Sequence, residues 1–254
     1  GYHNYAVADV DMDGRDEIVF GSMVIDDNGK GLSTTGFGHG DAELVGDLNP
    51  YVHGLEIYAC MEDHPGNNFR DATTSKVYHR FVADRDDGRA MAGNFTNSFP
   101  GGLGCSAREG AISTITGEAI RGLEATGVNT NFRIYWDGDL CEETFNYLDG
   151  KNTAGCIAKY GYWSPIYTCE GSMTNNDTKG TPCYQGDILG DWREEIIMRT
   201  SNNNIRIYST PTATKWRNYT LWHDHQYRNA MVWQMCGYNQ PPHASYFLGE
   251  LEGS

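Results

Sequence analysis

The protein has 254 residues, of which 39% are hydrophobic, and a formal net charge of -15. This length is sufficient for a large core, and the strong negative charge argues against a nucleic-acid partner. No apolar run approaches the length of a membrane span, so a membrane partner is not expected either. Gly and Tyr are frequent and amphipathic helical patterns are scarce, which predicts an all-β protein of many short strands and turns.

The first predicted strands flank an acidic segment, AVADVDMDGRDEIVFG, at residues 6–21. Its spacing D-x-D-x-D-G is that of the first half of an EF-hand calcium loop, with Gly14 at the sharp turn, but the flanks YAVADV and EIVFG are typical of strands. A calcium ion would relieve the repulsion among its carboxylates, whereas the alternative is an acidic surface turn without metal. The predicted ligands are Asp9, Asp11, Asp13, Asp16 and Glu17.

The same plan of apolar pair, acid, turn and strand recurs along the chain. LVGDLNPYVHGLEIYA (44–59) and QGDILGDWREEIIMR (185–199) are further copies, MAGNFTNSFPGGLGCSA (91–107) is a degraded one, and FRIYWDGDL (132–140) is a related strand and turn. The copies add predicted calcium ligands: Asp47, Asn49, Glu56, Asp187, Asp191 and Glu195.

The repeats have a period of roughly 40 to 47 residues, which is typical of the four-stranded blades of a β-propeller. We therefore expect residues 1–254 to form part of a single β-propeller domain of about four to five blades with calcium-binding loops. Closure of such a ring ties the last blade to the first strand, and no segment of this sequence is an evident closing strand. The alternative is a larger ring whose first blades are absent from this chain.

Seven cysteines are many for a cytosolic chain, and none has the spacing of a zinc site. Disulfide bonds in an oxidising compartment are the better interpretation, although the pairing cannot be derived from sequence. This cysteine content predicts an exported, extracellular protein.

Five stretches of the chain, in order from the N-terminus to the end, resemble one family. They are NYAVADVDMDGRDEIVFGSMVIDDNGKGL, STTGFGHGDAELVGDLNP, RIYWDGDL, TKGTPCYQGDILGDWREEIIMRT and WQMCGYNQPPHASYFLG. They are similar to the rhamnogalacturonan lyases of polysaccharide lyase family 11. The resemblance implies a secreted, eight-bladed β-propeller that binds several Ca²⁺ ions and cleaves the rhamnogalacturonan I backbone of pectin by β-elimination. It also implies that this chain corresponds to the C-terminal half, with the remaining blades on missing sequence or on a separate partner chain.

The resemblance assigns Lys179 as a catalytic base. The run NNDTKGTPC (175–183) is similar to the Asn-Gly-Thr-Lys turn of that family, in which Asn176 and Thr178 would contact the substrate. Asp177 stands where the family has Gly, so an acidic side chain must adopt a turn conformation that suits Gly, and its charge would repel a galacturonate. Without the resemblance, Lys179 would be interpreted as a solvated surface lysine.

The run GYNQPPHASYFLG (237–249) supplies the second predicted catalytic residue, Tyr238, again by resemblance. Asn239 and His243 in the same loop are predicted to bind substrate, because the two prolines between them would hold polar groups in place. The alternative for Tyr238 is a tyrosine packed at the edge of a sheet.

Arginines and histidines elsewhere offer further candidates. Arg193 is predicted to pair with a uronate carboxylate, and Arg228 is a second candidate, although either could bridge neighbouring acids. His39 and Asp41, like Asp137 and Asp139, could face a substrate channel or bind metal.

Aromatic and histidine side chains near the third acidic repeat have two interpretations each. Trp192 and Trp222 could stack on sugars or pack in the core. On a predicted strand, only His223 and His225 of HDH could share an ion.

Two functional classes remain open at this stage. The first is a calcium-dependent rhamnogalacturonan lyase, of endo or exo type. The second is a non-catalytic calcium-binding propeller used for adhesion, assembly or glycan binding. A glycoside hydrolase is a weaker third, because a specific pair of carboxylates cannot be singled out among so many.

Overall fold

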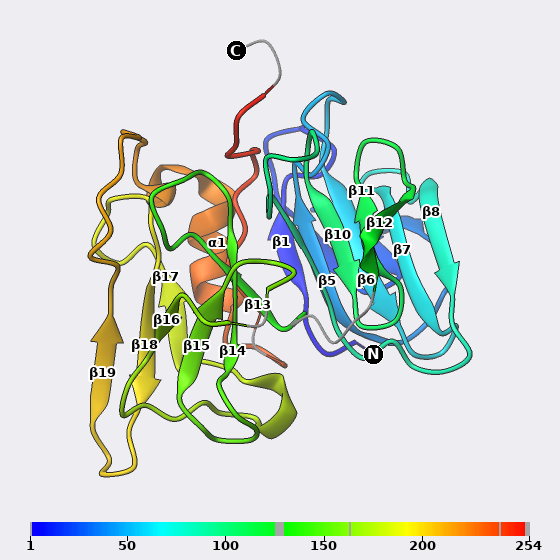
Figure 1. The fold of residues 1–254 in the computed structure, drawn as a ribbon. Helices are drawn as coiled ribbons and strands as arrows, with labels where there is room; N and C mark the ends of the chain where they lie inside the picture. The colour runs from blue at the N-terminus through cyan, green and yellow to red at the C-terminus, as the bar shows by residue number, and fades with distance from the viewer. Residues whose placement is uncertain (1, 125–129, 163, 239, 252–254) are drawn as a thin grey trace.

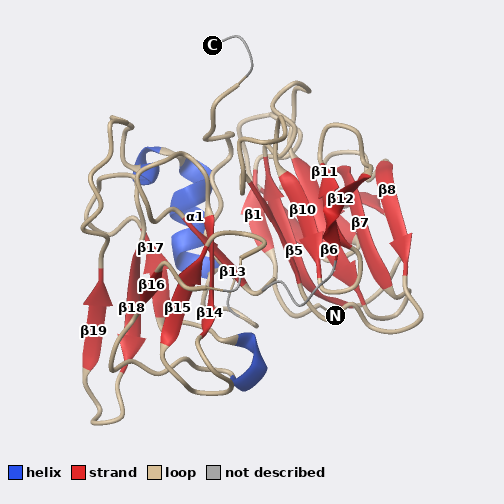
Figure 2. Ribbon diagram, in the orientation of Figure 1, coloured by secondary structure: helices blue, strands red, loops and turns tan. Residues whose placement is uncertain are grey.

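A computed structural model describes residues 2–124, 130–162, 164–238 and 240–251. Within this range the protein is an all-β structure of five antiparallel sheets that follow one another along the chain (Figure 1, Figure 2). The first four sheets have four strands each and the fifth has three. In every sheet, strands that are consecutive in sequence are neighbours, so the chain builds one meander after another.

The strands of the first two sheets are β1 (Ala6–Ala8), β2 (Glu17–Phe20), β3 (Met23–Ile25), β4 (Gly31–Thr34), β5 (Gly40–Gly46), β6 (Glu56–Met61), β7 (Gly66–Asp71) and β8 (Val77–Val82). Those of the third and fourth are β9 (Ala90–Gly93), β10 (Leu103–Ser106), β11 (Gly110–Ser113), β12 (Ala119–Glu124), β13 (Phe132–Ile134), β14 (Glu143–Tyr147), β15 (Gly155–Ala158) and β16 (Tyr167–Thr168). The fifth contains β17 (Tyr184–Gly186), β18 (Glu195–Arg199) and β19 (Ile205–Tyr208). Helical segments are η1 (Asp177–Lys179), η2 (Leu221–His223) and α1 (His225–Trp233).

Apolar side chains fill the interfaces between consecutive sheets. One buried cluster joins the first two sheets, with Val19 and Ile57 among its members. A second joins the second and third sheets around Phe69 and Leu103, and a third joins the last two sheets. Burying side chains of this size stabilises the fold by about 1.5–3 kcal/mol each, so the packing between sheets holds the short strands together.

Neighbouring sheets meet along their first strands. β1 contacts β5, β5 contacts β9, and β9 contacts β13. Gln185 in β17 donates from Nε2 to the Arg133 carbonyl in β13 at 2.6 Å, which joins the last two sheets. Helix α1 then contacts β1, and Gln234 at its end exchanges hydrogen bonds with the Gln185 backbone (Figure 1). The succession of contacts thus returns to the first sheet through a helix.

The C-terminal segment 240–248 runs between these sheets (Figure 1). Asp47 Oδ2 accepts the backbone N–H of Phe247 at 3.3 Å, and Asn94 Nδ2 donates to the carbonyl of Leu248 at 3.4 Å. The residues that follow the first strands of the second and third sheets therefore hold this segment in place.

One expectation of local structure was wrong. The HDH run does not lie on a strand: His223 ends η2, and His225 begins α1 with Asp224 as N-cap. His223 and His225 consequently face different partners, because Nδ1 of His223 lies 2.8 Å from the Thr220 carbonyl and Nε2 of His225 lies 2.7 Å from Asp16. Among the described residues, no helix is long and apolar enough to span a membrane.

The expected disulfide bonds are absent, since all seven cysteines are unpaired thiols in this structure. Several serve as small buried core residues instead. Cys60 and Cys105 belong to the cluster between the second and third sheets, whereas Cys169 lies in the cluster between the last two. Burial raises the pKa values of these three thiols, as expected for inert core cysteines.

Candidate active site and cation loops

Four metal-ligating side chains converge at one end of the first two sheets: His3, His39, Asp41 and Glu62. One ligand atom from each lies within 4.8 Å of the others. Nε2 of His3 is 3.2 Å from Nε2 of His39 and 3.4 Å from Asp41 Oδ1, while Nε2 of His39 is 3.3 Å from Glu62 Oε2. Two imidazole and two carboxylate groups at these distances suit a divalent cation, and we call this group the histidine cluster.

The two predicted catalytic residues lie beside the histidine cluster. The ring of Tyr238 stacks on that of His3, with centroids 4.1 Å apart, and Nζ of Lys179 lies 4.8 Å from the Tyr238 ring centroid. The chain can pass this close to His3 because residue 237 is Gly, with φ of +64°, where a Cβ atom would meet the His3 carbonyl at 1.6 Å. Residues from the two ends of the chain and from η1 thus form one site.

The turn that carries Lys179 has a left-handed backbone. Asn176 has a φ of +57° and Asp177 a φ of +47°, so Asp177 adopts the conformation expected at a position where the resembling family has Gly. Asn176, Asp177 and Thr178 are exposed. The Asp177 carboxylate lies 3.6 Å from Lys151 Nζ and does not line the groove described next, so its charge is directed elsewhere.

A groove of about 340 Å³ extends from Lys179 between the third and fourth sheets. Arg89 and Asn131 line it together with Asp41 and Thr178. Burial lowers the pKa of the Arg89 guanidinium, and Nη1 of Arg89 is buried without a hydrogen-bond partner in the described part of the chain. Burial and the Asp86 carboxylate raise the pKa of Asp41, against the opposing effect of Lys179, His3 and Arg89.

Sequence reasoning singled out His39 and Asp41 but missed the groups that complete the site. Glu62 follows β6, the strand paired with β5, and its backbone N–H donates to the His39 carbonyl at 2.8 Å. A correct pairing of the predicted strands would have found it. His3 and Arg89 carry no local signal, because they reach the site through the arrangement of whole sheets.

The first acidic loop has the form expected of a calcium loop. Ligand atoms of Asp9, Asp11 and Asp13 lie within 4.8 Å of one another, and Gly14 has a φ of +92°. Asp9 Oδ2 accepts the N–H of Gly14 at 3.0 Å, while its Oδ1 is buried without a partner. An all-oxygen group with an unsatisfied buried oxygen fits a calcium ion.

The other two predicted ligands of this loop have protein partners. Asp16 Oδ2 accepts from His225 at 2.7 Å and from Asn229 at 3.0 Å, both on α1, so it anchors the loop to the helix. Glu17 Oε2 accepts the N–H of Val10 at 2.9 Å. Asp16 is therefore oriented toward α1 in this structure.

The same glutamate position recurs in four hairpins, and each time it supports the loop backbone. Glu56 Oε2 accepts from Leu48 and Asn49 at 2.9 and 3.0 Å, and Glu195 Oε2 accepts from Ile188 and Leu189 at 2.9 Å. The glutamate of the acidic repeat thus accepts hydrogen bonds from backbone N–H groups of the loop, which explains part of the repeat.

The remaining predicted ligands in the second and fifth sheets do not form carboxylate clusters among the described residues. Asp187 Oδ2 accepts from Thr220 and from the backbone of Leu221, at 2.6 and 2.8 Å. Asp191 pairs with Arg193 at 2.8 Å, and Arg193 also donates to the carbonyl of Thr212. Arg193 therefore bridges a neighbouring acid, which is the alternative that the sequence left open.

Asn49 and the tryptophans are also placed away from the candidate active site. Asn49 Oδ1 accepts the N–H of Tyr51 at 3.3 Å, within its own turn. Trp192 is 2% exposed and packs in the core, and Trp222 donates from Nε1 to the Asp187 carbonyl at 2.5 Å. Arg228 donates to the carbonyls of the residues before α1.

The fourth hairpin loop contains a carboxylate cluster that is occupied by a lysine. Nζ of Lys159 lies 2.7 Å from Asp137, 3.0 Å from Asp139 and 2.5 Å from Glu143. Burial raises the pKa of Glu143 to about 7 while Lys159 opposes the rise. Burial lowers the pKa of Lys159, but the three carboxylates outweigh this effect and raise it.

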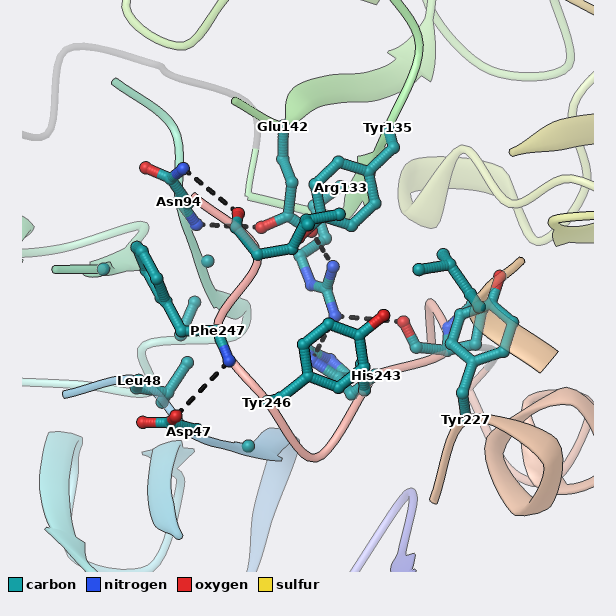
Figure 3. Close-up of a pocket in the computed structure, with 18 residues that line it drawn as sticks. Asp47, Leu48, Asn94, Arg133, Tyr135, Glu142, Tyr227, His243, Tyr246 and Phe247 are labelled. Carbon is teal, nitrogen blue, oxygen red and sulfur yellow. Dashed lines mark hydrogen bonds and ion pairs between the residues drawn. The ribbon is translucent and has the colours of Figure 1, made fainter. Parts of the chain in front are cut away.

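His243 lines a small cavity together with Arg133 and Glu142 (Figure 3). It is 3% exposed, and its Nδ1 contacts Arg133, which pairs with Glu142. The adjoining cavity measures only about 30 Å³, enough for water but not for a sugar. Asp47 and Phe247 line the same cavity. The structure therefore places His243 in the interior with Arg133 as its partner, away from Lys179 and Tyr238, and Asn239 lies outside the described residues.

A cluster of potential metal ligands beside a lysine–tyrosine pair, with a groove and a buried arginine next to it, has the composition of an enzyme active site. The sequence comparison specifies the family. Residues 1–252 match the C-terminal domain of rhamnogalacturonan lyase family 11, and the chain belongs to this family.

Curated relatives and solved structures agree with this assignment. The rhamnogalacturonan endolyase YesW of Bacillus subtilis is 44% identical over 256 residues, which cover 98% of this chain and 40% of YesW. The exolyase YesX of the same organism is 41% identical and is covered to 43%. The crystal structure of YesW matches with a TM-score of 0.87, at 42% identity over 100% of this chain and 43% of that one. A Bacillus licheniformis rhamnogalacturonan lyase matches with a TM-score of 0.89, at 40% identity over 98% of this chain and 42% of that one. The chain thus spans about two-fifths of the length of its relatives.

Proposed function

We propose that this chain carries the proton-transfer residues and a cation site of a rhamnogalacturonan lyase. The observation that supports it most strongly is the convergence of Lys179 and Tyr238 with the histidine cluster. The substrate would be the rhamnose–galacturonate backbone of rhamnogalacturonan I, cleaved by β-elimination. The names of the relatives, one an endolyase and one an exolyase, leave both modes of cleavage open for this chain.

The proposal includes the architecture and the setting. The five meander sheets would be blades of a β-propeller, and the rest of the ring would come from sequence beyond this chain or from a separate chain. Calcium would occupy the loop of Asp9, Asp11 and Asp13, which supports it by its all-oxygen ligands. A pectic substrate is found outside cells, so the enzyme would be secreted.

The reaction removes the C5 proton of galacturonate and breaks the C4–O bond, forming a C4–C5 double bond. A divalent cation, when bound by the histidine cluster, would neutralise the uronate carboxylate and stabilise the negative charge that develops on it. Two of the four ligands are imidazoles rather than carboxylates, so the site has less negative charge to repel the substrate. Asp41 is 6% exposed and would thus form the fixed side of the site.

Lys179 and Tyr238 would divide the proton transfers. Lys179 would act as the base that takes the C5 proton, and the Tyr238 hydroxyl would donate a proton to the leaving C4 oxygen. Their separation, 4.8 Å from Nζ to the ring centroid, allows both to reach one sugar ring. Arg89, with Nη1 unpartnered, would bind an oxygen of the substrate in the groove.

The test is the ultraviolet absorbance of the unsaturated uronate formed from rhamnogalacturonan I. We expect product with the protein itself, or with the chain joined to the part of YesW that it does not match. Lys179→Ala and Tyr238→Phe should each lower kcat by at least about a hundredfold. Lys151→Ala is the matched control, because its ammonium is exposed and pairs only with Asp177 among the described groups.

Metal dependence is tested in the same assay. Chelation should abolish product, and Ca²⁺, Mn²⁺ or Zn²⁺ added back singly should identify the ion that the histidine cluster uses. Glu62→Gln should raise the concentration of ion needed for half-maximal rate. Binding of the polysaccharide without any product from the joined chain would overturn the lyase proposal and favour a non-catalytic glycan-binding propeller.

A further inference from the structure

One buried asparagine connects the two functional parts of the groove. Asn131 precedes β13 and is 6% exposed. Its Oδ1 accepts from Arg89 Nε at 2.9 Å, and its backbone carbonyl accepts from Arg89 Nη2 at 3.2 Å. Two of the three guanidinium nitrogens of Arg89 are therefore fixed by a single residue.

The amide nitrogen of Asn131 makes the second connection. Nδ2 donates to the carbonyl of Thr178 at 3.2 Å and to Asn146 Oδ1 at 3.0 Å. Thr178 immediately precedes Lys179 in the left-handed turn, so this bond ties the lysine-bearing turn to the fourth sheet. Both Nδ2 hydrogens and one side-chain oxygen lone pair are used, which fixes the amide orientation.

The orientation of Arg89 leaves one part of the guanidinium for a ligand. Nη1 is the nitrogen that Asn131 does not hold. It is buried without a hydrogen-bond partner among the described residues, and the Arg89 side chain lines the groove. A buried guanidinium with an unsatisfied N–H group is costly unless a ligand completes it. An anionic or hydroxyl oxygen of a sugar is the ligand that suits it.

We propose that Asn131 is a positioning residue for the elimination, which holds the Arg89 guanidinium beside the groove and fixes the turn of Lys179. This inference rests on the proposed function. It concerns a residue that touches no reacting atom itself and acts through Arg89, which precedes β9, and through Thr178, which lies in η1.

The variants are Asn131→Asp and Asn131→Ala, with Asn94→Ala as control. Asn94 is 4% exposed and also donates to two carbonyls, of Leu140 and Leu248, but it lies away from Lys179. Asn131→Asp keeps the acceptor for Arg89 and adds a carboxylate that competes with the substrate for the guanidinium. Asn131→Ala releases both Arg89 and the turn.

We expect Asn131→Asp to raise KM about tenfold and, because it loses the Nδ2 donors that hold the turn, to lower kcat as well, whereas Asn131→Ala should lower kcat about tenfold. Asn94→Ala should lower the melting temperature like Asn131→Ala but leave KM and kcat near the wild-type values. KM and kcat within about twofold of wild type in both Asn131 variants, or equal losses in the Asn94 control, would overturn the inference.

Failure of the proposed function would be recognised separately. If the wild-type protein makes no unsaturated product, calorimetric binding of a saturated rhamnose–galacturonate oligosaccharide decides the inference. Wild-type binding that is about tenfold tighter than that of Asn131→Asp supports it. No wild-type binding, or equal affinities, contradicts it.

Discussion

The first and fourth hairpin loops have the same framework but opposite ways of balancing charge. In the first, Asp9, Asp11 and Asp13 face one another, and no ion pair joins them to a cationic side chain among the described residues. In the fourth, the ammonium of Lys159 lies within 3.0 Å of all three carboxylates. One loop is therefore suited to a bound ion, whereas the other contains its own cation.

Strand register explains the difference. Ile18 pairs with Ile25, and Thr144 pairs with Ala158, so Asp26 stands opposite Glu17 as Lys159 stands opposite Glu143. The first sheet adds a carboxylate at the position where the fourth adds an ammonium group. The residue just after the third strand thus has opposite charges in the two sheets, which the D-x-D spacing alone does not reveal.

Removing the internal cation should produce the largest effect. Lys159→Met leaves three carboxylates unpaired, with the Glu143 side chain fully buried, and should destabilise the protein by about 3 kcal/mol in urea unfolding. Calcium should restore part of this loss, because the loop then resembles the first one. Lys151→Met, at an exposed pair, should change stability by less than about 0.5 kcal/mol. Equal effects of the two substitutions would break the comparison.

Removing the calcium ion from the first loop should produce the second-largest effect. Calcium at a hundred times its dissociation constant should stabilise the wild-type protein by about 2.7 kcal/mol, measured as the shift of the unfolding midpoint on adding calcium to chelated protein. Asp11→Asn should lose most of this gain, since it removes a ligand charge from the first loop. Asp84→Asn, an exposed acid elsewhere, should keep it. A full calcium response in Asp11→Asn would contradict the assignment of the first loop.

Changes of pH also alter the stability of the protein in such experiments, and the buried His243 contributes to this effect. Burial and the nearby Arg133 lower the pKa of His243 well below 6.5, so the unfolded chain binds a proton that the folded protein does not. Above pH 6.5 the histidine therefore does not lower the free energy of unfolding. Below pH 6.5 it lowers the free energy of unfolding by up to about 1.4 kcal/mol per pH unit. In chelator, His243→Gln should show a shallower slope between pH 6.5 and 5 than wild type, whereas the exposed His53→Gln should not.

The smallest effect is expected at the turn beside the candidate active site. Asp177 adopts a φ of +47°, which Gly adopts without strain. Asp177→Gly should stabilise the protein by about 0.5 kcal/mol and leave calcium dependence unchanged, as judged from thermal unfolding with and without chelator. Destabilisation would show that the exposed pair with Lys151 matters more than the backbone strain.

The sequence predicted the all-β class, the strands around each acidic repeat, and Lys179 and Tyr238, which the structure brings together. It could not distinguish Asp9 from Asp47 or Asp187, because all three follow a first strand, yet the latter two hold backbone N–H groups of distant segments. It also missed His3, because no local pattern shows which sheet will pack against the chain terminus. Spacing along the chain specifies a hairpin, but only tertiary packing specifies what its side chains contact.

The most direct test of the account is the anomalous diffraction of crystals grown with manganese or a lanthanide ion in place of calcium. The account predicts peaks at the histidine cluster and among Asp9, Asp11 and Asp13, and none among Asp137, Asp139 and Glu143 with Lys159 in place. A peak in the fourth loop with the lysine displaced, or no peak at the histidine cluster, would contradict it.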